Sequence, residues 1–205
     1  MARWEPGTAE RLQQAALELF ASRGYEQTTA TEIAQSVGLT ERTFFRHFAD
    51  KREVLFHGQE LLQGAFLTGM DSAPAGAGAL DVVIVAMHSA ATEFFPAERR
   101  PHSRARQTII DRNPALRERE RHKLATLGAT VAAALRDRGI GELPAVLAAE
   151  SGIMVFRLAF GLWIREGEQR SLADIQTAVF GELFTLTATA AGSAADDVQQ
   201  REVQR

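Results

Sequence analysis

The chain has 205 residues, no cysteine and a formal net charge of −3 at pH 7. The lack of cysteine excludes disulfides, thiolate metal sites and cysteine nucleophiles, and it suits a reducing cytoplasm. The first ten residues lack the apolar run of a signal peptide, and no later stretch reads as 18 or more apolar residues. We therefore expect a cytoplasmic protein that does not associate with a membrane.

Helical patterns run along the whole chain. Alanine and leucine are abundant and β-branched residues rarely cluster, which predicts an all-α fold of about nine helices. Apolar residues recur at helical spacing over about 8–23, and Gly24 ends this first helix. Thr29 offers an N-cap hydroxyl to a short second helix that Gly38 ends. The later helices are expected at about 40–47, 51–67, 80–95, 98–111, 115–138, 144–165 and 172–191, with Thr40 and Asp50 capping the first two of these.

Composition divides the chain into three parts. Residues 1–56 form a small N-terminal helical unit. Residues 57–192 form a larger helical bundle that a connecting helix joins to the first unit. Residues 193–205 are polar enough to be a disordered tail.

The second and third predicted helices, with a glycine turn between them, have the layout of a helix-turn-helix, whose second helix lies in the DNA major groove. Phe44 and Phe48 are four residues apart and share the inward face, so the charged residues lie on the other sides. Two readings stay open for each exposed residue. Arg42 reads a guanine edge or is a solvated arginine, and Lys51 binds a phosphate or is an ordinary first-turn lysine.

Two adjacent basic residues, Arg46 and His47, also allow two readings. They contact phosphates, or they pair with Asp50 and Glu53. The global charge does not settle the matter, because residues 1–51 are about neutral and DNA binding therefore depends on where the charges lie.

The stretch TATEIAQSVGLTERTFFRHFADKREVL, residues 29–55, closely resembles the DNA-binding domain of the TetR family of transcriptional regulators. With the preceding ALELFASRGYEQTT, the resemblance covers about residues 8–56. It implies a homodimeric repressor that leaves a palindromic DNA operator when a small-molecule inducer binds. The residues that it assigns to DNA contact are Thr29, Ala30, Thr31, Thr40, Glu41, Arg42, Thr43, Phe45, Arg46, His47 and Lys51.

The chain departs from this family pattern at two of those positions. Phe45 stands where a tyrosine is usual, so a phosphate hydrogen bond from a phenol is missing and an apolar contact remains. Thr31 stands where many members have arginine, which removes a groove contact.

The last two predicted helices are the expected dimer interface. They are apolar around much of their circumference, and Gly152, Gly161 and Gly181 permit close approach of another helix. The alternative is that both are central core helices of a single bundle. A helix-turn-helix protein gains from pairing in any case, because two recognition helices engage successive major grooves of a palindrome.

The bundle also carries soft and aromatic side chains that suit an irregular ligand pocket, although each also suits an ordinary core. Residues 99–123 contain nine Lys or Arg against three Asp or Glu. Such a run is a solvated face, attracts the anionic head of a ligand, or faces the DNA. The predicted ligand-binding residues are Phe66, Met70, Met87, Phe94, Phe95, Met154, Phe156 and Trp163.

The sequence predicts no enzyme, metal site or cofactor. The five histidines form no HxxxH or HExxH pattern, and neither a GxSxG motif nor a glycine-rich phosphate loop is present. Two other functions remain: a transcriptional activator, and a helical ligand-binding or interaction protein that does not read DNA.

Overall fold

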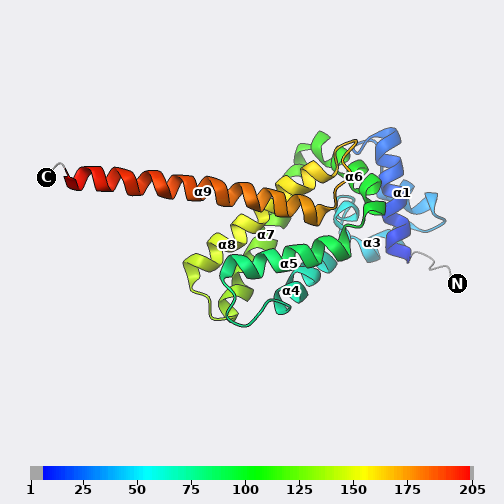
Figure 1. Cartoon of the computed structure of the whole chain (residues 1–205). Helices are drawn as coiled ribbons and strands as arrows, with labels where there is room; N and C mark the ends of the chain where they lie inside the picture. Colours follow the sequence, from blue (N-terminus) through cyan, green and yellow to red (C-terminus); the bar gives the residue numbers. More distant parts are fainter. Residues whose placement is uncertain (1–6, 204–205) are drawn as a thin grey trace.

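The computed structural model describes residues 7–203, with side chains described through residue 189. All regular secondary structure in this part of the chain is helical, which confirms the predicted all-α fold. The elements are α1 (Thr8–Arg23), α2 (Ala30–Ser36), α3 (Glu41–His47), η1 (Glu53–Phe56), α4 (Gln59–Asp71), α5 (Ala79–Phe94), η2 (Ala97–Arg99), α6 (Arg100–Arg112), α7 (Pro114–Asp137), α8 (Glu142–Trp163) and α9 (Leu172–Val203), of which η1 and η2 are 3-10 turns. Helices α1 and α3 lie at one end of the molecule, and α9 projects from the other (Figure 1).

Side-chain caps fix the starts of α2 and α3. The Thr29 hydroxyl accepts a hydrogen bond from the Glu32 N–H at 3.2 Å, and the Glu32 carboxylate accepts one from the Thr29 N–H at 2.8 Å. The Thr40 hydroxyl accepts from the Thr43 N–H at 3.2 Å and begins α3. These reciprocal bonds satisfy backbone donors that a helix start leaves unpaired. The predicted N-terminal caps at Thr29 and Thr40 are confirmed.

The predicted fourth helix is wrong in its start. The Asp50 carboxylate does accept hydrogen bonds from the next N–H groups, those of Arg52 and Glu53, but they open only the single turn η1. Gly58 then adopts a left-handed conformation, with φ of 85°, and α4 begins one residue later. The left-handed backbone cannot continue a helix, so η1 is a separate short segment between α3 and α4.

The buried apolar side chains form two clusters. One lies under α1–α3 and is closed by Ile109 and Ile110 of α6 and Leu116 of α7, which come from far along the chain. The other fills the bundle of α4, α5, α7, α8 and the start of α9. Because α6 and the start of α7 pack against the first cluster, these helices tie the N-terminal unit to the bundle.

Gly152 of α8 permits a close approach within the chain itself. A Cβ atom at this position would lie 2.4 Å from Val83 Cγ1 of α5, far inside van der Waals contact. At Gly161 and Gly181, by contrast, an added Cβ would meet nothing within 4 Å. The predicted role of Gly152 at a dimer interface is therefore replaced by packing against α5.

Helix α9 is longer than predicted. It has 32 residues and continues through Val203, about 48 Å at 1.5 Å per residue. The backbone is helical over 193–203 of the predicted polar tail, and residues 204 and 205 lie outside the described residues. The projecting part of α9 leaves the bundle entirely (Figure 1).

Helix α8 is apolar enough to resemble a membrane-spanning helix, although no such segment was expected from the sequence. Its length of 22 residues and its mean hydropathy of 1.6 meet the criteria for such a helix. The core helix of a water-soluble protein meets the same criteria, and α8 packs against α5, α7 and α9.

Candidate DNA-binding surface and interdomain cavity

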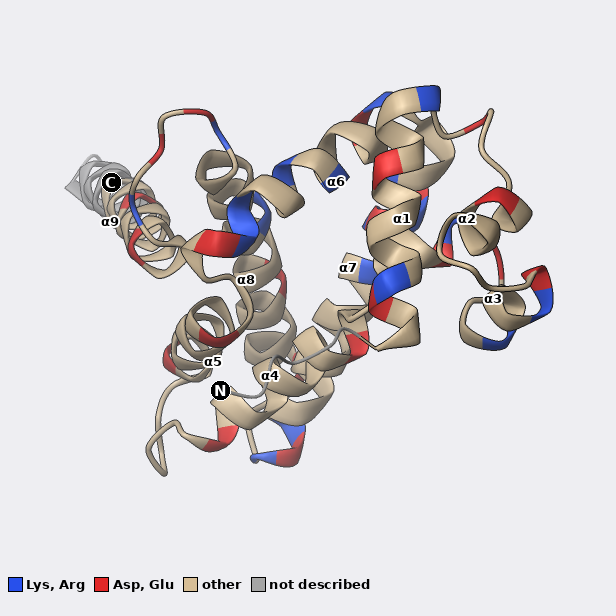
Figure 2. Ribbon diagram, turned by 90° about the vertical axis from the view of Figure 1, so that its right-hand side faces the viewer, with Lys and Arg blue, Asp and Glu red and all other residues tan. Residues whose placement is uncertain are grey.

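Helix α3 presents two different faces. Phe44 is fully buried and Phe48 nearly so, and their ring centroids lie 5.3 Å apart in the N-terminal core. Phe45, between them in sequence, is 48% exposed. Burying a phenylalanine stabilises a core by several kcal/mol, so the two inward rings fix how α3 is turned. Figure 2 shows α2 and α3 at the end of the molecule farthest from α9.

The residues predicted to touch DNA lie on this outer surface. Within the described side chains, Arg42 and Arg46 form no ion pair, and Asp50 pairs with Arg52 at 2.6 Å. The alternative pairing of Arg46 and His47 with Asp50 or Glu53 is therefore not formed. Thr29, Thr40, Glu41, Arg42, Phe45, Arg46 and His47 are exposed, whereas Ala30, Thr31, Thr43 and Lys51 are half-buried.

Lys51 differs from the other basic residues because its ammonium already forms a hydrogen bond within the protein. Its Nζ donates a hydrogen bond to the Tyr25 carbonyl at 2.8 Å and lies 4.1 Å from the centre of the Tyr25 ring. Burial, with the nearby carboxylates of Asp50 and Glu26, raises the pKa of Tyr25 to about 12, so this phenol stays neutral. The tether holds the Lys51 ammonium against the segment between α1 and α2 and leaves N–H groups for another acceptor.

A cavity of about 430 Å³ lies between the N-terminal unit and the bundle. Its apolar wall is formed by Phe94 and Phe95 at the end of α5 and by Phe156 and Phe160 of α8. Three of the eight predicted ligand-binding residues, Phe94, Phe95 and Phe156, are in this lining. The other five lie elsewhere: Phe66, Met70, Met87 and Trp163 are buried in the bundle core, and Met154 is on the surface.

The cavity lining also has polar residues, which the sequence alone did not predict as a site. It includes Arg106 of α6, Lys123 of α7, and Gln13 and His57 from the N-terminal side. The signal that could have found the first two was the basic run over 99–123.

Much of that basic run has a structural role. The Arg104 side chain donates hydrogen bonds to the carbonyls of Ile164 and Arg165, and Arg100 donates to those of Glu168 and Arg170. These guanidinium groups hold the end of α8 and the connection to α9. Because Arg100 and Arg104 are already bonded to backbone carbonyls, this part of the run is not a free solvated face.

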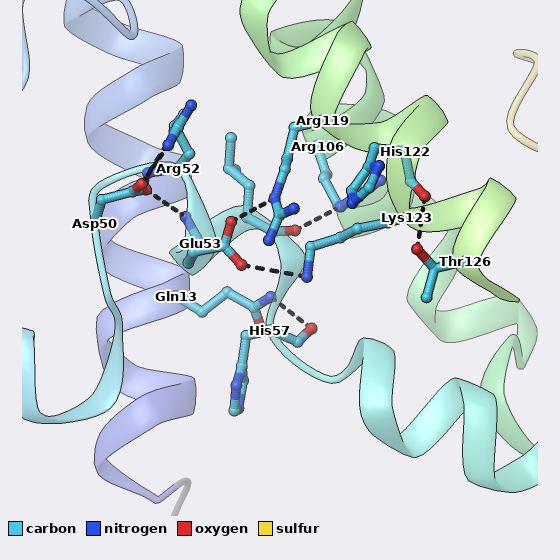
Figure 3. A network of polar contacts seen from close by, with 11 residues as sticks. Gln13, Asp50, Arg52, Glu53, His57, Arg106, Arg119, His122, Lys123 and Thr126 are labelled. Atoms are coloured by element: carbon cyan, nitrogen blue, oxygen red, sulfur yellow. Dashed lines mark hydrogen bonds and ion pairs between the residues drawn. The ribbon is translucent and has the colours of Figure 1, made fainter.

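A polar network joins η1 to α6 and α7 beside the cavity (Figure 3). The Glu53 carboxylate accepts a hydrogen bond from Arg119 Nε at 2.7 Å and pairs with Lys123 Nζ at 3.2 Å. Arg106 donates to the Leu55 carbonyl at 2.7 Å. Burial alone would raise the pKa of Glu53, but the hydrogen bonds and charges of Arg119 and Lys123 outweigh it and hold that pKa below its usual value.

Comparison with known proteins identifies the N-terminal unit. The family model described as "Bacterial regulatory proteins, tetR family" matches residues 12–57, which run from α1 through η1. Residues 12–57 are thus similar to the DNA-binding domain of the TetR family. The HTH-type transcriptional regulator TcmR of Streptomyces glaucescens is 43% identical over 76 residues, which are 37% of this chain and 34% of TcmR. The chain thus matches about a third of the length of this curated relative.

Solved structures extend the likeness to the whole TetR-family fold. A transcriptional regulator from Pseudomonas aeruginosa PAO1 has a TM-score of 0.59 at 19% identity, covering 92% of this chain and 95% of that one. The Thermus thermophilus repressor FadR, crystallised with lauroyl-CoA, has a TM-score of 0.52 at 23% identity, covering 86% of this chain and 93% of that one. At these identities the likeness shows a shared fold.

The chain also exposes apolar residues on its last two helices. Large apolar residues of α8 recur at helical spacing on the surface, and α9 adds two more. The open positions at Gly161 and Gly181 lie on the same two helices. We call the residues Leu143, Leu147, Met154, Leu158 and Phe184 the α8–α9 face. Leu186 comes two residues after Phe184, so it lies on a different side of α9. Among the described residues, no cluster of His, Asp or Glu could hold a metal ion.

Proposed function

We propose that this protein is a homodimeric repressor that binds a palindromic DNA operator through α3 and releases it when a small molecule fills the interdomain cavity. The observation that carries the proposal is the two-faced α3, in which Phe44 and Phe48 are anchored while Arg42 and Arg46 face solvent without carboxylate partners. Such a repressor acts in the cytoplasm, where the DNA is.

The exposed residues divide by the contacts they suit. Arg42, in the first turn of α3, suits bidentate recognition of a guanine edge in the major groove. Arg46, His47 and Lys51 suit phosphates, which position the protein on the duplex without reading its sequence. Phe45 offers only an apolar surface, which suits a thymine methyl group.

A dimer follows from the surface of α8 and α9. A monomeric helix-turn-helix makes few base contacts, whereas two α3 helices about 34–36 Å apart engage successive major grooves. The α8–α9 face supports the pairing of two copies, because an apolar patch of this kind on a soluble protein marks an interaction site. Leu147 and Leu158 of this face are 59% and 49% exposed.

The cavity supports regulation by a small molecule. Its volume falls in the range of ligand pockets, and its lining includes residues of both the N-terminal unit and the bundle. FadR of the same fold was crystallised with lauroyl-CoA, which supports an organic ligand for this chain as well. A ligand that binds one conformer better shifts the population toward it by that difference in affinity.

Selection of duplexes from a random library tests the proposal. The protein is expected to enrich an inverted repeat whose half-sites are centred about 10 bp apart or a multiple of that distance. Enrichment of no sequence would favour the second candidate, a helical interaction protein that does not read DNA. That candidate is supported by the tethered Lys51 and by the missing hydroxyl at Phe45.

A further inference from the structure

The lining of the interdomain cavity includes both aromatic rings and charged side chains. The rings of Phe95, Phe156 and Phe160 have centroids 5.6 to 5.9 Å apart, and these rings offer their faces and edges to a flat apolar body. The charged side chains of the lining include more cations than anions. Its Lys and Arg side chains are Arg99, Arg106, Lys123 and Arg157, and its carboxylates are Asp111 and Glu120.

The carboxylates of the cavity lining balance only part of its positive charge. Arg106 pairs with Glu120 at 3.0 Å, and the Gln107 amide donates to both Asp111 and Glu120, so these carboxylates are already engaged. Burial, followed by the positive charges of Arg99 and Arg106, lowers the pKa of His102. Burial disfavours any charge here, whereas the two guanidinium groups repel a cation and attract an anion.

Lys123 is the cation that the cavity shares with the DNA-binding side of the molecule. Its ammonium lines the cavity, pairs with Glu53 Oε2 at 3.2 Å and lies 5.5 Å from the centre of the Phe56 ring. Glu53 and Phe56 are the two ends of η1, the segment that connects α3 to α4. Figure 3 shows Lys123 extending from α7 across to Glu53.

We infer that the cavity binds an aromatic acid, whose flat body lies against the phenylalanines and whose acidic group takes Lys123 away from Glu53. The Glu53–Arg119 contact at 2.7 Å remains, so η1 is loosened without being released. The ligand thus acts directly on the segment that carries α3, instead of through a change in the bundle core. The link to DNA release rests on the proposed function, but the binding chemistry does not.

Two fluorescent probes that differ by one anionic group test the ligand class. Both 1-anilinonaphthalene-8-sulfonate and the uncharged N-phenyl-1-naphthylamine have the same aromatic body. We expect the full-length protein to bind the sulfonate about tenfold more tightly, which is the effect of one charge-assisted hydrogen bond. Equal affinity, or no binding of the sulfonate, would overturn the inference.

Three variants locate the anion. Lys123→Met keeps the apolar stem and should remove the preference for the sulfonate, leaving the uncharged probe unaffected. Glu53→Gln removes the competing carboxylate and should tighten sulfonate binding severalfold. Arg136→Met on the far part of the same helix, whose partner is the exposed Glu142, removes the same charge and should change neither affinity. A sulfonate preference that survives Lys123→Met would refute the site.

A second titration separates this inference from the proposed function. On a duplex selected from the library, the sulfonate probe should weaken DNA binding by the wild-type protein. For Glu53→Gln, the fold-change in DNA affinity that the probe causes should be less than half of the wild-type fold-change. If no duplex binds the protein, the proposed function fails while the probe titrations still decide the ligand class. If the probe weakens both proteins equally, the route through Glu53 is wrong.

Discussion

Replacing Glu53 with glutamine should destabilise the fold by an amount that depends on pH. Glu53 is 20% exposed and contacts Arg119 Nε at 2.7 Å and Lys123 Nζ at 3.2 Å. A charge-assisted hydrogen bond contributes about 1.5–3 kcal/mol when its partners are desolvated. The two basic side chains remain 20–33% exposed, and glutamine keeps one acceptor, so we expect a loss of about 1–2 kcal/mol in all.

The sign of the pH dependence follows from the lowered pKa of Glu53. The folded state holds this pKa below the ordinary 4.5, so the carboxylate stabilises the protein fully above that pH. As the pH falls through the lowered pKa, the folded carboxylate takes up a proton and the contribution is lost. The difference between the wild type and Glu53→Gln should therefore be constant near neutrality and shrink below 4.5.

Urea unfolding at several pH values, followed by circular dichroism, measures this difference. Glu142→Gln serves as the control, because its contact with Arg136 is on the surface, with Glu142 71% exposed, and should contribute less than about 0.5 kcal/mol. A loss for Glu53→Gln no larger than that for Glu142→Gln, or one that does not change with pH, would refute the role given to this network.

Three further substitutions test the placement of other residues. Phe45→Ala should weaken DNA binding in a mobility-shift titration while changing stability by less than about 0.5 kcal/mol, whereas Phe44→Ala should cost about 3–5 kcal/mol in urea unfolding. The reverse order of stabilities would show that α3 is turned differently. Gly152→Ala should destabilise by about 1–3 kcal/mol through its clash with α5, while Gly64→Ala, at an exposed position of α4 with open space, should stabilise by up to about 1 kcal/mol. A neutral Gly152→Ala in thermal unfolding would contradict that packing. Leu158→Glu should convert a dimer to a monomer in light scattering, and an unchanged mass would exclude the α8–α9 face as the interface.

Local chemistry made much of the fold predictable. Thr29 and Thr40 cap their helices through hydroxyls that act within three residues, so the sequence alone places α2 and α3. Phe44 and Phe48 are assigned to the core by their spacing, and the structure confirms both. The same spacing predicts that Phe45 points outward, and its side chain is exposed in the structure.

Two features could not be predicted without the tertiary structure: the break before α4 and the interdomain cavity. The pattern from Val54 onward reads as one helix, and only the left-handed Gly58 and the contacts of η1 with α6 and α7 divide it. The cavity brings together side chains from helices as distant as α1 and α8, so no local pattern describes it. The sequence could show a surplus of positive charge over 99–123, but not that Arg100 and Arg104 bind backbone carbonyls while Arg106 and Lys123 reach the cavity.

The measurement that bears most directly on the central claim is the affinity of the protein for a selected palindrome and for a scrambled duplex of equal length at one fixed salt concentration. Fluorescence anisotropy with labelled duplexes gives both constants. The account predicts at least about a thousandfold preference for the palindrome, and a loss of much of that preference in Arg42→Ala. Equal affinity for the two duplexes would contradict it.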